Sequence, residues 1–82
     1  MQMLLTGGQI RAARGFLNWS ARELAQAANL GLSTVQRVEA GGVITGANFD
    51  AIRHTLEAAG VEFIPETESG AGVRLRKPAG AE

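Results

Sequence analysis

The stretch of sequence that decides the fold runs from Ser20 to Gly41 and reads SARELAQAANLGLSTVQRVEAG. Ser20 and Glu23 have the spacing of a capping box, in which the serine hydroxyl and the glutamate carboxylate each accept a hydrogen bond from a backbone N–H at the start of a helix. The apolar residues that follow recur at helical spacing, at Leu24, Ala27 and Ala28. A short helix with one buried face is therefore expected directly after Ser20.

A second short helix is expected over residues 31–40. Val35 and Val38 lie three positions apart and define its inward side. The pair Gly41 and Gly42 ends it, because glycine readily adopts the left-handed conformation of a helix C-terminal cap. Two short helices joined by a tight turn leave the outer side of the second one exposed. The major groove of B-form DNA is about 12 Å wide and accepts one helix, so this arrangement suits the reading of a duplex.

One further helix is expected on each side of this stretch. Thr6 and Gln9 form another capping box, which predicts a helix from Thr6 to about Leu17. A last helix is expected from about Asn48 to Ala59, with Gly60 as its stop. The apolar positions of both helices recur at helical spacing, at Ile10, Ala13 and Leu17 in the first and at Phe49, Ile52 and Leu56 in the last.

After Gly60 the hydrophobic period becomes strand-like. Residues 61–64 and 73–76 are separated by a segment rich in turn residues, which predicts a β-hairpin with a long loop. A two-stranded hairpin is marginally stable in water, so it must pack on the helices or pair with the hairpin of another chain. The residues expected at such a dimer interface are Val61, Phe63, Ile64, Val73 and Leu75.

The predicted fold is therefore mainly α, a four-helix bundle over residues 1–60 followed by a β-hairpin over residues 61–77 and a flexible tail over residues 78–82. A chain of 82 residues builds one small core, which favours support from a partner subunit. The 45% apolar content excludes a disordered chain. The sequence shows neither a signal peptide nor a membrane span, so a cytoplasmic protein is expected.

Catalysis, metal binding and cofactor binding are not expected. The chain has no cysteine and one histidine, His54, and no carboxylate pair has the spacing of an acid and base. The formal net charge is zero, whereas most DNA-binding proteins carry excess Lys and Arg. The charge is unevenly distributed, however: four arginines face two glutamates up to Glu39, and Arg74, Arg76 and Lys77 form a second basic cluster. This cluster either protects a strand edge or touches the backbone of bound DNA.

The central stretch resembles the phage-repressor and Cro-like helix-turn-helix regulators, the Xre family. The resemblance is carried by Ser20, Glu23-Leu24-Ala25, Ser33-Thr34-Val35, Arg37-Val38-Glu39 and Gly41, and it extends from Thr6 to Gly60. The chain departs from the family pattern at two places. Asn29 stands in the turn where the family usually has glycine, and Leu32-Ser33 begins the recognition helix with fewer long polar side chains than most members have.

The resemblance implies DNA contacts at matching positions. Base contacts are implied for Leu32, Ser33 and Arg37, and phosphate contacts for Ser20, Ala21 and Thr34. It also implies an ion pair between Arg14 and Glu39 that holds the recognition helix on the scaffold. From chemistry alone, Arg37 can donate two hydrogen bonds to guanine, which is worth about 1–3 kcal/mol of discrimination. Gln36 can reach an adenine edge, and Arg22 can hold a phosphate.

Two function classes follow from these observations. The leading hypothesis is a homodimeric transcription regulator, expected to act as a repressor, whose two recognition helices read a palindromic site in double-stranded DNA about 34 Å apart. The alternative is a protein-interaction module, such as an antitoxin, whose C-terminal hairpin binds a partner by strand addition. Ser20 also fits a purely structural role as a helix cap, and Arg37 an ordinary solvated position.

Overall fold

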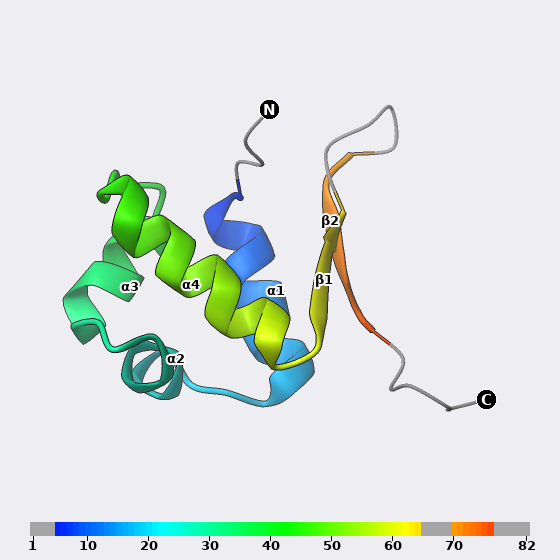
Figure 1. Cartoon of the computed structure of the whole chain (residues 1–82). Coiled ribbons are helices and arrows are strands. Elements are labelled where there is room, and N and C mark those ends of the chain that lie inside the picture. The colour runs from blue at the N-terminus through cyan, green and yellow to red at the C-terminus, as the bar shows by residue number, and fades with distance from the viewer. Residues whose placement is uncertain (1–4, 65–69, 77–82) are drawn as a thin grey trace.

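The computed structural model describes residues 5–64 and 70–76. Residues 65–69 of the predicted loop, Lys77 and the predicted tail over residues 78–82 lie outside the described residues. Within the described ranges the chain forms four helices followed by two antiparallel strands (Figure 1), which are α1 (Gly7–Leu17), α2 (Ala21–Ala28), α3 (Leu32–Glu39), α4 (Gly46–Ala58), β1 (Val61–Ile64) and β2 (Gly72–Leu75). The prediction of a mainly helical fold with a C-terminal hairpin is confirmed.

Both predicted capping boxes are present and set the starts of α1 and α2. The backbone N–H of Gln9 donates to the Thr6 hydroxyl at 3.1 Å, and the Thr6 N–H donates to Gln9 Oε1 at 2.9 Å. At α2 the corresponding distances between Ser20 and Glu23 are 3.0 and 2.7 Å. Both helices end at an asparagine in the left-handed conformation, Asn18 with φ 57° and Asn29 with φ 59°. Asparagine tolerates this conformation better than most residues do, so it substitutes for glycine here.

Several predicted boundaries are wrong by one or two residues. The helix α4 begins at Gly46 instead of Asn48, because the Thr45 hydroxyl accepts a hydrogen bond from the Asn48 N–H at 3.2 Å and so caps the helix earlier. The helix α3 covers residues 32–39, since Gly31 is its N-cap and Ala40 its C-cap. The strand β2 covers residues 72–75 instead of 73–76.

The core lies between the four helices and the hairpin. Its fully buried large side chains come from every helix and from β1, and they are Ile10, Leu24, Val35, Ile52, Leu56 and Val61. The predicted inward position of Ala27 is wrong, because Ala27 is exposed while Ala25 is 3% exposed. The reason is that α2 contacts both α3 and α4, so its buried face covers Leu24, Ala25 and Ala28.

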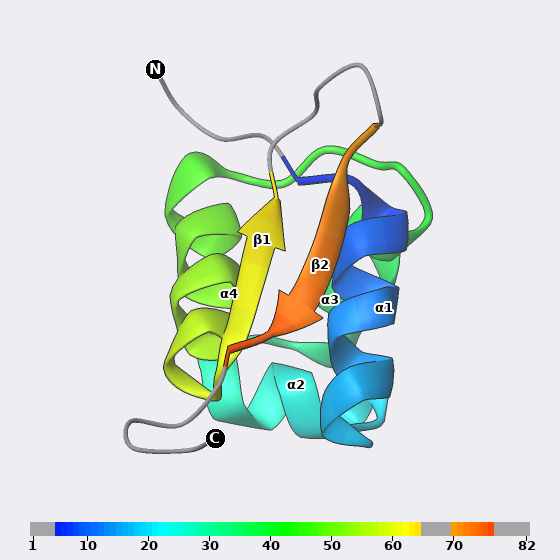
Figure 2. The same cartoon turned by 90° about the vertical axis from the view of Figure 1, so that its right-hand side faces the viewer.

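The hairpin packs on the helices of its own chain, on the side of the molecule away from α3 (Figures 1 and 2). In Figure 2 it lies in front of the helices, with β1 in contact with α4 and β2 in contact with α1. The buried Gln9 side chain ties it to α1, because its Nε2 donates to the carbonyl oxygens of Gly72 at 3.1 Å and Ile64 at 3.5 Å. The hairpin was expected either to pack on its own helices or to pair with the hairpin of another chain, and the structure shows it packed on its own helices.

In the described residues, every helix is too short or too polar to cross a membrane.

Candidate nucleic-acid interface

The outer side of α3 carries the predicted base-contact residues. Val35 and Val38 anchor the inner side in the core, at 0% and 6% exposure. The side chains of Ser33, Gln36 and Arg37 are exposed, whereas Leu32 is half-buried. A helix with two inward valines necessarily turns the positions between them outward. The structure therefore brings Ser33, Gln36 and Arg37 to one accessible surface and leaves Leu32 at its margin.

The N-terminus of α2 carries most of the predicted phosphate-contact residues. Ser20 and Arg22 are exposed and Ala21 is half-buried against the core. The capping box uses the backbone N–H groups of Ser20 and Glu23. In the described residues, the N–H groups of Ala21 and Arg22 have no such partner, as expected for the first turn of a helix. These two groups point along the helix axis and can meet an anion.

Thr34 lies on α3, so the predicted phosphate contacts do not form one cluster. It lines a hollow of about 390 Å³ between α3 and the start of α4. The residues that line this hollow are Thr34, Arg37, Val43, Ile44, Thr45 and Asn48. Val43 is 86% exposed, which is unusual for an apolar side chain. Asn48 was expected only as the start of the last helix, and Val43 and Thr45 were not expected at the interface, because they lie in a segment without a recognisable period.

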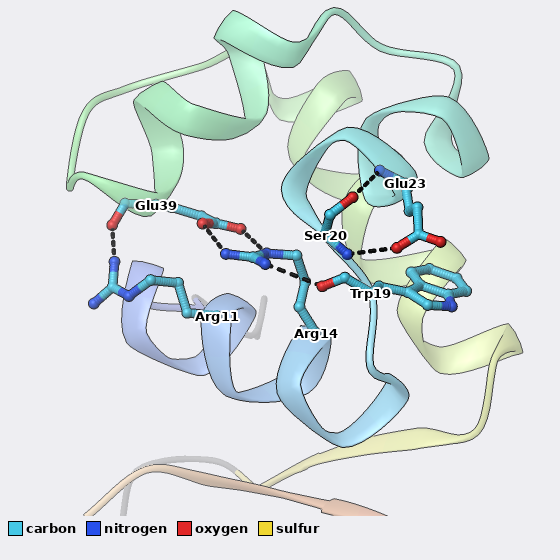
Figure 3. Close-up of polar contacts among 6 residues, drawn as sticks. All are labelled: Arg11, Arg14, Trp19, Ser20, Glu23 and Glu39. Atoms are coloured by element: carbon cyan, nitrogen blue, oxygen red, sulfur yellow. Dashed lines mark hydrogen bonds and ion pairs between the residues drawn. The ribbon is translucent and has the colours of Figure 1, made fainter.

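The ion pair expected between Arg14 and Glu39 is present and bidentate (Figure 3). Arg14 Nε lies 2.7 Å from Glu39 Oε2, and Arg14 Nη2 lies 2.8 Å from Glu39 Oε1. The remaining donor, Nη1, binds the backbone carbonyl oxygen of Trp19 at 3.1 Å. The side chains are 19% and 8% exposed. The hydrogen bonds to Glu39 raise the pKa of Arg14, against a smaller opposing effect of burial, so the Arg14 guanidinium stays charged.

Two further residues of α1 hold the end of α3, and the sequence analysis missed both. Arg11 Nη1 donates a hydrogen bond to the backbone carbonyl oxygen of Glu39 (Figure 3). A Cβ atom on Gly7 would lie 2.7 Å from the carbonyl carbon of Glu39, so only glycine lets the two helices approach this closely. Glycine is an unfavourable residue in a helix, so its presence at position 7 was the signal in the sequence that another segment packs closely against it. Arg11, Arg14 and Gly7 together fix α3 against α1.

Four arginines of the described chain have no carboxylate partner. Three others form ion pairs: Arg14 with Glu39, Arg53 with Asp50 and Glu57, and Arg74 with Glu62. Arg11 and Arg76 donate to backbone carbonyl oxygens, which are neutral and leave their charge uncompensated. Within residues 5–64 and 70–76, Arg22 and Arg37 have neither kind of partner. Both are exposed, Arg37 on α3 with Ser33 and Gln36 and Arg22 in the first turn of α2.

The residues predicted at a dimer interface are buried to very different degrees. Val61 is 0% and Phe63 5% exposed, so both are used in the core of their own chain and leave almost no surface for a second one. Ile64 and Val73 are half-buried, and Leu75 is 48% exposed. The surface that remains for a partner on the hairpin therefore centres on Leu75.

Groups of His, Cys, Asp and Glu that could hold a metal ion are absent from the described part of the chain. No known protein family model matches this chain, and no curated protein shows a significant sequence match to it.

Proposed function

We propose that this chain is a sequence-specific DNA-binding transcription regulator of the phage-repressor and Cro-like helix-turn-helix type, with α3 as its recognition helix. The observation that carries the proposal is the combination of three features of α2 and α3. The outer side of α3 is polar and exposed and carries Arg37, Arg22 is exposed at the start of α2, and the Arg14–Glu39 ion pair joins α3 to α1. A short helix with an exposed polar and basic side suits the major groove.

The proposal assigns different roles to α3 and α2. Arg37 donates two hydrogen bonds to guanine, Gln36 and Ser33 reach neighbouring base edges, and Leu32 touches a thymine methyl group at the margin. Phosphates are held by groups at the start of α2 and by one residue of α3. These are the backbone N–H groups of Ala21 and Arg22, the Arg22 guanidinium, and the hydroxyls of Ser20 and Thr34. Phosphate contacts set the position of the protein on the duplex, whereas base contacts select the sequence.

The full proposal is a cytoplasmic homodimeric repressor that occupies a palindromic site in a promoter. Two copies would place their α3 helices in successive major grooves about 34 Å apart. Light scattering on the purified protein measures its oligomeric state directly. A dimer at micromolar concentration is expected, and a monomer at high micromolar concentration contradicts the homodimer.

The decisive experiment selects duplexes from a random library with the purified protein and sequences them. We expect two related half-sites separated by about one helical turn. Recovery of a random set of sequences rejects the assignment.

Substitutions then separate the roles of Arg22 and Arg37. Arg37→Ala should lower affinity for the selected duplex about 5- to 100-fold, with little effect on random duplex, because it removes a bidentate base contact. Arg22→Ala should lower affinity for both duplexes alike. Arg74→Ala is the control, because Arg74 lies on the hairpin, away from α3. Equal losses on selected and random duplex for Arg37→Ala argue against base reading.

The salt dependence tests the charge assignment. Each neutralised phosphate changes the slope of log affinity against log salt by about −0.9. Arg22 is the arginine assigned to phosphate, so its two copies in a dimer contribute about −1.8 to the slope, and Arg22→Ala should make the slope less steep by that amount. An unchanged slope for Arg22→Ala contradicts its phosphate role.

The antitoxin-like alternative is favoured by one observation, the exposed strand β2. Arg74, Leu75 and Arg76 are exposed, so this strand offers surface to a partner chain. Leu75→Lys should abolish binding to a co-purifying partner if the hairpin mediates it. DNA binding lost together with partner binding would instead indicate that Leu75 serves the dimer.

A further inference from the structure

The turn that ends α3 brings Gly42 back beside Arg37, five positions earlier in the chain. The Gly42 N–H donates to the Arg37 carbonyl oxygen at 2.8 Å, and the Gly41 N–H donates to the Val38 carbonyl oxygen at 3.1 Å. Gly41 has a φ of 92°. These bonds and this conformation define a Schellman motif, which reverses the chain and places the second residue after the cap against the last turn of the helix.

Gly42 is glycine because of the space that Arg37 occupies. A Cβ atom on Gly42 would lie 2.6 Å from Arg37 Cγ, 2.9 Å from the Arg37 carbonyl oxygen and 3.5 Å from Arg37 Cδ. Gly42 itself is not among the glycines with positive φ, so its backbone is open to any residue. The aliphatic stem of Arg37 therefore lies directly on the Cα of Gly42.

We infer that Gly42 is a positioning residue for Arg37. By carrying no side chain it lets the stem of Arg37 rest on the turn, and this contact limits the directions that the guanidinium can take. An arginine on an exposed helix surface otherwise samples many rotamers, and fixing them costs free energy when it binds. The contact reduces that cost before binding. The consequence for DNA rests on the proposed function, whereas the contact itself does not.

Gly41 provides a matched control. It is the neighbouring residue in the same turn, but a Cβ atom on it would meet nothing within 4 Å. Gly41→Ala strains the backbone, because φ is positive there, and leaves the stem of Arg37 in place. Gly42→Ala has no positive φ to strain, but its Cβ displaces the stem of Arg37 and crowds the Arg37 carbonyl oxygen. The pair therefore separates strain in the turn from displacement of Arg37.

The first test measures discrimination between two probes, the duplex that the wild-type protein selects and a shuffled duplex of the same composition. Gly42→Ala should lower the ratio of the two affinities about tenfold, equivalent to about 1.4 kcal/mol. Gly41→Ala should leave that ratio unchanged. An unchanged ratio for Gly42→Ala, or the same loss for both variants, overturns the inference.

The second test needs no DNA and is a thermodynamic cycle on the free protein. Gly42→Ala is combined with Arg37→Lys, which keeps Cγ and Cδ, and with Arg37→Ala, which removes them. Gly42→Ala should lower the Tm by about 5 °C with arginine or lysine at position 37, and clearly less with alanine. Equal shifts in all three backgrounds overturn the inference. If Gly42→Ala alone does not fold, recovery of folding in the double variant with Arg37→Ala supports it, and failure to recover overturns it.

The two tests fail separately. A protein that selects no duplex refutes the proposed function, and the cycle still decides whether Gly42 holds the stem of Arg37.

Discussion

Replacement of Glu39 by glutamine removes one charge from the ion pair with Arg14 and changes almost nothing in size. Arg14 keeps its bond to the Trp19 carbonyl oxygen but loses its charged partner and one of its two hydrogen bonds to residue 39, because a glutamine amide is neutral and turns a donor toward the guanidinium. Arg14 is 19% exposed and Glu39 8% exposed, so water replaces the lost interaction only in part.

The magnitude follows from this burial. Removal of one partner from a fully buried pair costs about 3–5 kcal/mol, and an exposed pair contributes about 0–1 kcal/mol. The Arg14–Glu39 pair lies between these cases but nearer the buried one, so we expect a loss of about 2–3 kcal/mol in the free energy of unfolding. A domain of this size is stable by roughly 4–12 kcal/mol in total. The Tm should therefore fall by about 10–20 °C.

Thermal and urea unfolding followed by circular dichroism measure this loss. The matched control is Glu62→Gln, the same chemical change in the exposed pair with Arg74, which should lower the Tm far less than Glu39→Gln does. A double variant with alanine at positions 14 and 39 should lose less than the sum of the single variants, since neither charge is then left unpaired. A loss below about 0.5 kcal/mol for Glu39→Gln would refute the reasoning, because the pair would then behave as a surface contact.

Three further predictions test contacts of α1 and of the hairpin. Gly7→Ala should destabilise the protein by about 1–3 kcal/mol, because the added Cβ meets the backbone of Glu39, whereas Gly15→Ala, where nothing lies within 4 Å, should stabilise it by about 0.5–1 kcal/mol in urea unfolding. Gln9→Glu keeps the acceptor for the Thr6 N–H but loses the donor to the carbonyl oxygens of Gly72 and Ile64. Hydrogen exchange at the β1 and β2 amides should therefore accelerate, while exchange in α2 and α3 stays unchanged. Equal acceleration everywhere contradicts a role of Gln9 that is confined to holding the hairpin. Arg74 lowers the pKa of Glu62, so the Glu62 carboxylate binds a proton less readily in the folded state than in the unfolded state. The stability that the Glu62–Arg74 pair contributes is therefore present at neutral pH and is lost as the pH falls through the folded-state pKa, below 4.5. The difference in urea midpoint between wild type and Glu62→Gln should shrink in acid, and a difference that grows contradicts the prediction.

The parts of the fold that could be predicted depend on partners close in sequence. The caps at Thr6 and Ser20 bond residues three positions away, so a short pattern contains both donor and acceptor. The predicted start of α4 is too late because only half of a capping box is present there. The Thr45 hydroxyl accepts from the Asn48 N–H, but in the described residues the Asn48 side chain, at the position of the usual Glu or Gln, accepts no hydrogen bond from the Thr45 N–H.

Other parts depend on contacts between distant segments and leave no local pattern. Ala25 and Ala27 are equally small and apolar, and the packing of α2 against α3 and α4 decides that Ala25 is the buried one. The pair of Arg14 and Glu39 joins residues 25 positions apart, and it was expected only through the resemblance to a family. The contacts of Gly7 and Gly42 involve backbone atoms of other residues, so neither could be derived from hydrophobic spacing.

The neutral formal charge of the chain does not describe the surface that α2 and α3 present. The described residues include seven arginines and five acidic residues, and each acidic side chain is engaged: Glu39, Asp50, Glu57 and Glu62 with arginines, and Glu23 with the Ser20 N–H. These pairs place negative charge beside positive charge in the core, on α4 and on the hairpin. Opposite charges in a pair largely cancel at a distance, and salt screens what remains over about 8 Å. Of the charges without an oppositely charged partner, Arg11, Arg22 and Arg37 outnumber Glu23 around α2 and α3. On the proposed function, a duplex approaching this side would meet net positive charge, whereas one approaching the paired charges on α4 would meet a nearly neutral surface.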